Sequence, residues 1–154
     1  MPYDIEASSD GCYEGTTCLI NKLDIRDEEE LASVEAALTL ANIGLLEQEP
    51  LEGRFDFAHY RAIHKFLFGE LYDWAGEIRT VNLAKKGTQF VPANEIESVG
   101  RAIFERLAAM NFFCDDGFAA FIQNFTEFYC DTNLLHPFRE GNGRTQRVFL
   151  AQLI

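Results

Sequence analysis

The sequence predicts a mainly α-helical bundle that carries one short β-hairpin. Apolar residues recur at helical spacing in five segments, and two short β-prone runs occur near residues 78–91. Hydrophobic residues make up 47% of the 154-residue chain, including 14 Phe, which argues against disorder. A chain of this length fits one domain, which can bury about two-thirds of its unfolded surface in a single core.

The helical segments follow an irregular start. Residues 1–26 contain turn signals at Ser8-Ser9-Asp10-Gly11 and Glu14-Gly15, so we expect an irregular entry segment. A helix is predicted over residues 27–46, because the acidic run from Asp27 to Glu30 suits the positive end of the helix dipole. Its apolar residues share one face: Leu31, Val34, Ala37, Leu38 and Ala41.

Four more helices are expected. Asp56 can cap a second helix that runs to Leu71, and a third helix is predicted over residues 94–110. The fourth follows Asp115-Asp116-Gly117, and the fifth covers residues 144–154. An aromatic stripe at helical spacing in the fourth helix predicts core packing. The stripe consists of Phe118, Phe121, Ile122, Phe125, Phe128 and Tyr129.

The β-prone runs lie between the second and third helices. Residues 78–83 and 89–91 flank the turn Lys85-Lys86-Gly87-Thr88, and this arrangement predicts a hairpin. A two-stranded hairpin is marginal by itself, so it needs support from the rest of the domain.

Charge and cysteine pattern restrict the partners and the compartment. Thirteen Lys plus Arg against 25 Asp plus Glu give a net charge of −12, which opposes nonspecific binding to nucleic acid or to an anionic membrane. No apolar run is long enough to span a membrane. The four cysteines show no Cys-x-x-Cys spacing and residues 1–10 no signal peptide, so we expect a cytoplasmic protein with reduced thiols.

The densest group of reactive polar residues lies at His136-Pro-Phe-Arg-Glu-Gly-Asn-Gly-Arg-Thr-Gln-Arg147. Pro137 disfavours a helical His136, so the imidazole is expected at a helix end, where it can accept a proton near neutral pH. The glycines of Gly141-Asn142-Gly143 permit positive φ angles before a helix, which predicts an anion site made of backbone N–H groups.

Charged side chains complete this group. Arg144 and Arg147 are spaced i, i+3, so both guanidinium groups lie on one helix face and can bind neighbouring phosphates. Glu140 is the one carboxylate in the turn, and Mg²⁺ needs only one or two protein oxygens where phosphates supply others. Each feature alone has a structural explanation, but their combination predicts a site for a phosphorylated ligand.

This string resembles the signature of the Fic family, His-x-Phe-x-(Asp/Glu)-Gly-Asn-Gly-Arg-x-x-Arg, and matches it at every specified position. The resemblance implies a helical enzyme that transfers AMP from ATP to a Ser, Thr or Tyr hydroxyl of a target protein. It implies roles for eight residues: His136 as general base, Phe138 as buried anchor of the loop, Glu140 as Mg²⁺ ligand, Gly141, Asn142 and Gly143 as phosphate-binding residues, and Arg144 and Arg147 as contacts of the outer phosphates.

The resemblance also implies a role for the hairpin. Fic domains carry such a flap over the active site, and its edge is thought to pair with the target segment as an added strand. We therefore expect target-binding residues in the turn and the strand after it. These are Lys86, Gly87, Thr88, Gln89 and Phe90.

Fic domains generally continue with further helices, so we expect a Fic domain over residues 27–154 that is truncated at its C-terminus. Many members are inhibited by a glutamate in a Ser/Thr-x-x-x-Glu-Gly/Asn motif that pairs with the position of Arg147. None of the three Glu-Gly pairs in this sequence has Ser or Thr four residues before the glutamate. The inhibitor, if there is one, is expected beyond residue 154 or on a separate, antitoxin-like protein, as in a toxin-like system that can also act after delivery into another cell.

Several alternatives stay open from the sequence. Relatives transfer other nucleotides or phosphocholine, and removal of AMP from a modified target uses the same site. Related kinases depart from the Gly-Asn-Gly pattern, so the intact glycines favour AMP transfer. An alternative of another class is a noncatalytic, nucleotide-binding helical module.

Overall fold

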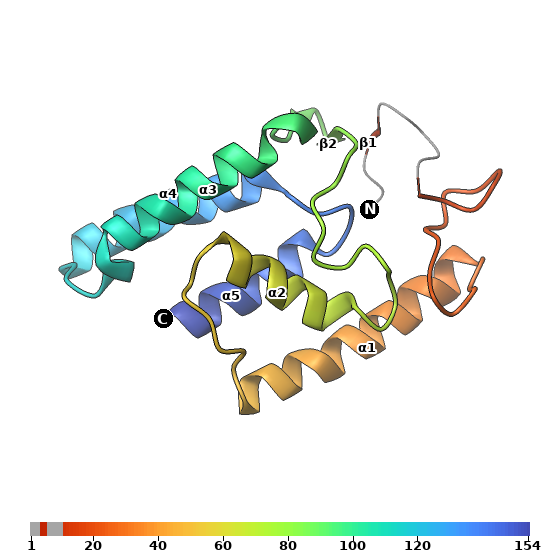
Figure 1. Cartoon of the computed structure of the whole chain (residues 1–154), viewed down its shortest axis with the longest axis horizontal. Helices are drawn as coiled ribbons and strands as arrows, with labels where there is room; N and C mark the ends of the chain where they lie inside the picture. The colour runs from red at the N-terminus through yellow and green to blue at the C-terminus, as the bar shows by residue number, and fades with distance from the viewer. Residues whose placement is uncertain (1–3, 6–10) are drawn as a thin grey trace.

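A computed structural model describes residues 4–5 and 11–154 of the chain. It confirms the predicted class, with helices and one small antiparallel sheet of order β1-β2-β3 (Figure 1). Two 3₁₀ turns, η1 and η2, flank the third helix. The elements are β1 (Asp4–Ile5), α1 (Glu28–Gln48), α2 (Phe57–Phe68), β2 (Leu83–Lys85), β3 (Thr88–Gln89), η1 (Ala93–Glu95), α3 (Ile96–Ala109), η2 (Asn111–Phe113), α4 (Phe118–Leu135) and α5 (Asn142–Leu153).

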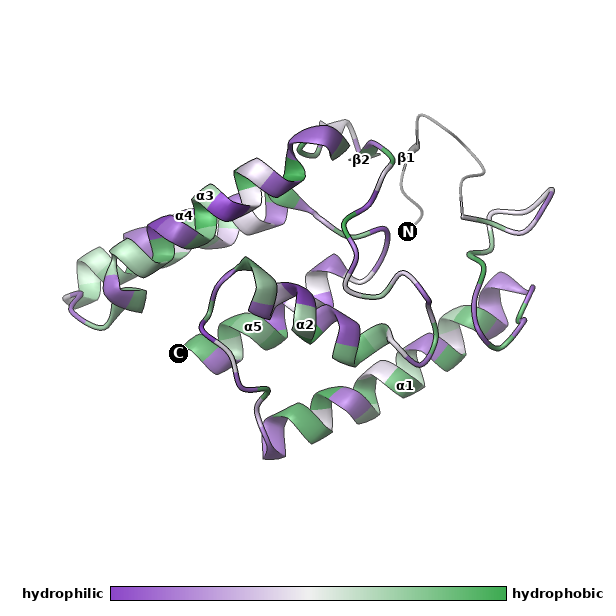
Figure 2. Cartoon of the chain, viewed as in Figure 1, coloured by the Kyte–Doolittle hydropathy of each residue, from purple (hydrophilic) through white to green (hydrophobic). Residues whose placement is uncertain are grey.

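The helices form three groups. α2 and α5 pack together at the centre, α1 packs against α2, and α3 and α4 pair on the opposite side (Figure 1). Hydrophobic and hydrophilic residues alternate along these helices, as expected for helices that bury one face and expose the other (Figure 2). The sheet lies beside the ends of α3 and α4 at which the chain leaves α4 for α5.

Two of the helix starts follow the predicted caps. The Asp27 carboxylate accepts a hydrogen bond from the Glu30 N–H at 2.8 Å, and the Asp56 carboxylate accepts one from the His59 N–H at the same distance. Each bond satisfies a donor that the first helical turn leaves without a partner. These caps place α1 and α2 within one or two residues of the predicted starts.

Phe149 of α5 is the centre of the aromatic core. Its ring is fully buried and lies edge-on to Tyr60 of α2 and Phe104 of α3, with centroid distances of 5.3 and 5.4 Å. Phe128 of α4 lies 6.1 Å away. This side chain therefore joins α5 to α2, α3 and α4, and it fixes the position of α5.

The predicted burial of the whole aromatic stripe on α4 was wrong. Phe128 is buried, but Phe118 is 82% exposed, and Ile122 and Tyr129 are also exposed. At about 100° per residue the stripe is wider than one contact face. α3 and α5 cover the side that holds Phe128, so the other side of the stripe faces outward among the described residues.

The hairpin is shorter than predicted. Its turn residues Lys86 and Gly87 have φ values of 50° and 81°, as expected for the two central residues of a type I′ turn. β2 also pairs with β1, through Asp4 with Ala84 and Ile5 with Leu83. The entry segment, expected to be irregular, thus supplies the third strand that the hairpin needs for support.

Among the described residues, no helix combines the length and the apolar composition needed to cross a bilayer.

The aromatic core yields a stability prediction. Replacing Phe149 by Ala should lower the free energy of unfolding by about 3–5 kcal/mol, because the substitution opens a cavity between four helices. Phe118→Ala is the matched control, because the same truncation on the exposed part of α4 should change stability by less than about 0.5 kcal/mol. Denaturant unfolding measures both, and equal losses would contradict the assignment of the core.

Candidate active site

The functional loop connects α4 to α5 and is anchored by Phe138. This ring is fully buried and stacks on the imidazole of His64, with centroids 3.8 Å apart, and on Tyr60 at 5.8 Å. The Asn142 side chain secures the same residue from the other side: its Oδ1 accepts the Phe138 N–H at 2.8 Å, and its Nδ2 donates to the Phe138 carbonyl at 2.7 Å. The loop is therefore held at its middle by packing and hydrogen bonds.

His136 follows the last residue of α4 and has left-handed backbone angles, φ 43° and ψ 59°. Helix α4 thus ends before Pro137 as predicted, but His136 is not in the extended region usual before proline. Its Nδ1 lies 3.1 Å from the Asn133 carbonyl, so Nδ1 carries the proton and Nε2 carries the lone pair. The ring of Phe90 stacks on the imidazole, with centroids 3.8 Å apart.

Burial is the main cause that lowers the pKa of His136 from 6.5 to about 4. The positive charges of Arg79 and Lys85 lower it further, while the hydrogen bond to Asn133 raises it. The imidazole is therefore neutral near pH 7, which is the form that can accept a proton.

Arg79 was missed in the sequence, although it connects the loop to the hairpin. The buried guanidinium donates to the carbonyls of His136 at 2.8 Å, Val81 at 2.7 Å and Val91 at 2.6 Å. The backbone N–H of Arg79 also donates to the Pro137 carbonyl at 2.9 Å. A single arginine inside a β-prone apolar run is the signal that could have identified it.

His64 packs against Phe138 and also makes two specific hydrogen bonds. Its Nδ1 accepts the Gly76 N–H at 2.8 Å, which leaves Nε2–H to donate to the Glu140 carbonyl at 2.9 Å. Burial, with a smaller contribution from Arg144, lowers the pKa of His64 to about 4. A neutral histidine with a fixed tautomer therefore supports the loop from α2, and no sequence spacing predicted this.

The N-terminus of α5 forms the other half of the site. Gly141 caps it with φ 79°, and the Thr145 N–H donates to the Gly141 carbonyl at 3.1 Å. The N–H groups of residues 142–144 come before this first helical bond, so they point out of the helix end, where anions bind. The side chain of Asn142 is hydrogen-bonded to Phe138 within the loop. An anion at this helix end would therefore bind the backbone N–H of Asn142 and not its side chain.

Glu140 lies at the opening of the loop. One carboxylate oxygen, Oε1, accepts the Gly141 N–H at 2.7 Å, and the side chain is about one-third exposed. No group of three or more His, Cys, Asp or Glu side chains suited to a metal occurs in the part of the chain that the structure describes. A single exposed carboxylate fits a cation that phosphates also bind, such as Mg²⁺.

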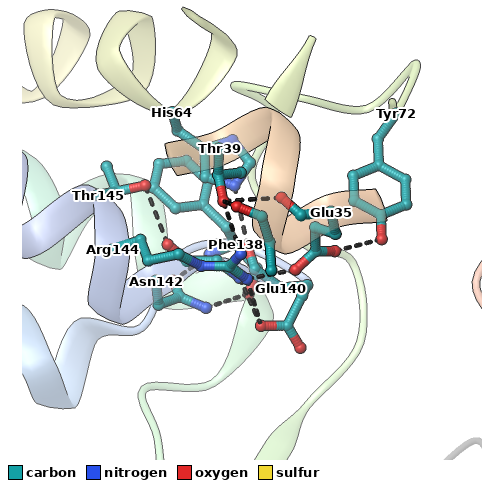
Figure 3. Close-up of polar contacts among 11 residues, drawn as sticks. Glu35, Thr39, His64, Tyr72, Phe138, Glu140, Asn142, Arg144 and Thr145 are labelled. Carbon is teal, nitrogen blue, oxygen red and sulfur yellow. Dashed lines mark hydrogen bonds and ion pairs between the residues drawn. The ribbon is translucent and has the colours of Figure 1, made fainter. Parts of the chain in front are cut away.

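The two arginines of the signature differ in their surroundings (Figure 3). Arg144 points toward α1, where it forms an ion pair with Glu35 and donates to Thr39 Oγ1 at 3.1 Å. Its guanidinium also lies 4.8 Å from the centroid of the Phe68 ring. Arg147 is exposed one helical turn later. The pair thus consists of one fixed and one solvent-facing guanidinium.

The predicted flap residues fall into three sets. Phe90 stacks on His136, the predicted base, and the Phe90 N–H donates to the Leu83 carbonyl at 3.1 Å. Thr88 and Gln89 lie on β3, which is exposed and is the outer strand opposite β1. Lys86 and Gly87 form the turn. The backbone groups at the edge of β3 therefore lie next to Phe90, whose ring stacks on His136.

The loop predicts a requirement for glycine at position 141. An alanine Cβ there would lie 2.2 Å from Cζ of Phe68 at a positive φ, so Gly141→Ala should lower the free energy of unfolding by about 2–5 kcal/mol. Gly143→Ala is the control, because a Cβ there meets only Arg147 Nη1, at 3.3 Å, and alanine favours the helix. Denaturant unfolding compares the two variants, and similar stabilities would contradict this account of the loop.

The buried histidines predict a pH-dependent stability. His64 and His136 titrate near 4 in the folded chain, against 6.5 when unfolded, so the unfolded chain binds more protons between these values. The free energy of unfolding should fall as the pH drops through this window, by at most about 1.4 kcal/mol per pH unit for each histidine. Unfolding curves between about pH 7 and about pH 5 measure the slope. His136→Ala should reduce this slope by the contribution of at most about one proton. An unchanged slope would count against a buried neutral His136.

Residues 54–154 match the Fic/DOC family. The chain is 38% identical to the probable protein adenylyltransferase y4lH of Sinorhizobium fredii, over 92% of this chain and 73% of that protein. It is also 38% identical to the protein adenylyltransferase VbhT of Bartonella schoenbuchensis, over 90% of this chain but 29% of VbhT.

Solved structures agree with this assignment. The N-terminal Fic domain of a Bartonella effector protein from Bartonella sp. AR 15-3 superposes with a TM-score of 0.88 at 28% identity, over 94% of this chain and 71% of that one. The BepC protein of Bartonella tribocorum, solved with bound AMPPNP, gives 0.85 at 27% identity, over 94% of this chain and 76% of that one. With the signature loop, its helical support and its hairpin all in place, the chain belongs to the Fic/DOC family.

Proposed function

We propose that the chain is a protein adenylyltransferase, which transfers AMP from ATP to a Ser, Thr or Tyr hydroxyl of a target protein and releases pyrophosphate. One observation carries the proposal: the loop holds a neutral His136 at one end and the amide-lined N-terminus of α5 at the other. Relatives named protein adenylyltransferases, at 33–38% identity over most of the chain, support it.

In this mechanism His136 is the general base. Its Nε2 takes the proton of the target hydroxyl, and the oxygen attacks the α-phosphorus in line with the bond to the β-phosphate. That bond breaks, and its electrons leave with pyrophosphate. Because burial lowers the pKa of His136 to about 4, the base is unprotonated in most molecules at neutral pH.

The N-terminus of α5 would stabilise the charge that develops on the phosphates. Gly141, Asn142 and Gly143 are our candidates for phosphate binding; the N–H groups of Asn142 and Gly143 point out of the helix end, whereas the Gly141 N–H is bound to Glu140 Oε1. Preorganised donors cost little reorganisation during the reaction.

Arg147, exposed on the next turn, is our candidate contact of the outer phosphates. The same role for Arg144 stays a prediction, because its guanidinium is paired with Glu35 and lies beside Glu140. We propose that the helix N-terminus, Arg147 and a bound Mg²⁺ offset locally the repulsion between ATP and a chain whose net charge is −12.

Mg²⁺ is the cofactor that we propose, with Glu140 as its protein ligand. The exposed carboxylate fits an ion that also takes phosphate oxygens and keeps several waters. When bound, the ion would neutralise negative charge on the phosphates.

The target is proposed to bind as a strand at the hairpin. Thr88 and Gln89 on the outer strand offer backbone groups, and Phe90 connects this edge to the base. We propose a cytoplasmic location, either in the producing cell or in a cell into which the protein is delivered. A separate antitoxin-like inhibitor and a toxin-like role belong to the same proposal. Bartonella relatives described as translocated effectors support delivery.

The test uses ATP labelled on the α-phosphate, with Mg²⁺ and a cell lysate as the source of targets. Label should transfer to protein with the wild-type chain, and His136→Ala should reduce the rate by about 10²- to 10⁴-fold while ATP binding persists. Comparing the nucleotide affinity of the two proteins controls for damage to the fold.

Two outcomes would contradict the proposal. Label transferred from the γ-phosphate would indicate a kinase. A fully active His136→Ala variant would exclude His136 as the general base. ATP binding without transfer of label from either position, in lysates that hold known Fic targets, would favour a noncatalytic nucleotide-binding module.

A further inference from the structure

A buried polar cluster outside the signature contacts its first arginine. Glu35 and Thr39 lie one turn apart on α1, more than 100 residues before Arg144 in the sequence. Glu35 is only 8% exposed, and its Oε1 forms the ion pair with Arg144 Nη2 (Figure 3). No sequence pattern linked α1 to the functional loop.

The guanidinium of Arg144 lies between two carboxylates. Nη2 faces Glu35 directly and lies 3.7 Å from Oε1 of Glu140, the proposed metal ligand. Nη1 donates to Thr39 Oγ1 at 3.1 Å, and the group lies over the Phe68 ring. The contacts on the α1 side hold Arg144 close to Glu35 and leave only a loose ion pair with Glu140.

Glu35 is itself fixed. Its second oxygen, Oε2, accepts a hydrogen bond from the Tyr72 hydroxyl at 2.5 Å. Burial and the nearby Glu35 carboxylate raise the pKa of Tyr72, so the phenol keeps its proton and stays a donor. Both Glu35 oxygens are therefore engaged, one by Tyr72 and the other by Arg144.

Such a pair is poorly explained by stability alone. Removing two charges from water costs free energy that their attraction does not reliably recover, so buried ion pairs often contribute little net stability. The Glu35–Arg144 pair has a more specific consequence, because it fixes the position of the Arg144 guanidinium. Oε1 of Glu140 already lies 3.7 Å from Arg144 Nη2, so Glu140 is the carboxylate that remains beside the guanidinium if the contact with Glu35 is lost.

We propose that Glu35 is a positioning residue that holds Arg144 toward α1 and thereby leaves the Glu140 carboxylate available to the Mg²⁺ of a bound nucleotide. The inference rests on the proposed function, because it concerns the same metal and nucleotide. Without Glu35, Arg144 keeps Glu140 as its carboxylate partner, and the metal has to compete with a guanidinium for that carboxylate.

The test is the Mg²⁺ dependence of binding of AMPPNP, measured by calorimetry on the whole chain. Glu35→Gln should raise the Mg²⁺ concentration for half-maximal binding by about tenfold, as for other residues that act through a metal ligand's surroundings. Excess Mg²⁺ should restore the binding. Thr39→Val, which keeps every charge, should give a smaller change in the same direction.

Two comparisons separate positioning from general effects. Asp131→Asn replaces a carboxylate that pairs with Arg106 between α3 and α4, and it should leave the Mg²⁺ requirement unchanged. In an Arg144→Ala background, Glu35→Gln should have no further effect on that requirement, because the competing guanidinium is absent.

Two results would overturn the inference in a chain that binds AMPPNP. One is an unchanged Mg²⁺ requirement in Glu35→Gln with only a lower thermal midpoint. The other is an equal shift with and without Arg144, which would indicate a simple loss of negative charge. Failure of the wild-type chain to bind AMPPNP at any Mg²⁺ concentration would overturn the proposed function as well, so the two failures are distinguishable.

Discussion

The functional loop has to be rigid although no helix or strand runs through it, and the burial of Phe138 meets this constraint. The ring packs on His64 and Tyr60 of α2, while Asn142 binds the backbone on both sides of it. Everything that the site presents is fixed relative to this point. The base lies two residues before it, and the helix N-terminus begins four residues after it.

Buried polar groups then connect the anchored loop to distant parts of the chain. Arg79 joins the His136 carbonyl to both ends of the hairpin, and His64 joins α2 to the Glu140 carbonyl. Buried groups of this kind are costly unless they are hydrogen-bonded, so their partners are strongly specified. Buried polar groups therefore fix the backbone at His136 and at Glu140, and connect it to the hairpin and to α2.

The sequence predicted what depends on local periodicity and on the signature. Helix starts at Asp27 and Asp56 and the end of α4 before Pro137 follow from capping and proline sterics, which act over a few residues. The roles of Arg79, Glu35 and His64 were not predicted, because each depends on a partner 57 or more residues away in the sequence. The strand β1 and the exposed side of α4 were missed for the same reason: tertiary neighbours decide them.

The order of the strands has a consequence for molecular recognition. β1 pairs with β2 along the side of the hairpin that would otherwise be open, so β2 is the central strand and β1 and β3 are the two outer strands of the described sheet. Of the two hairpin strands, only β3 is therefore an edge strand of the described sheet. The pairing of β1 thus closes the β2 side of the hairpin, and a polypeptide that extends the sheet next to the hairpin turn has to pair with β3.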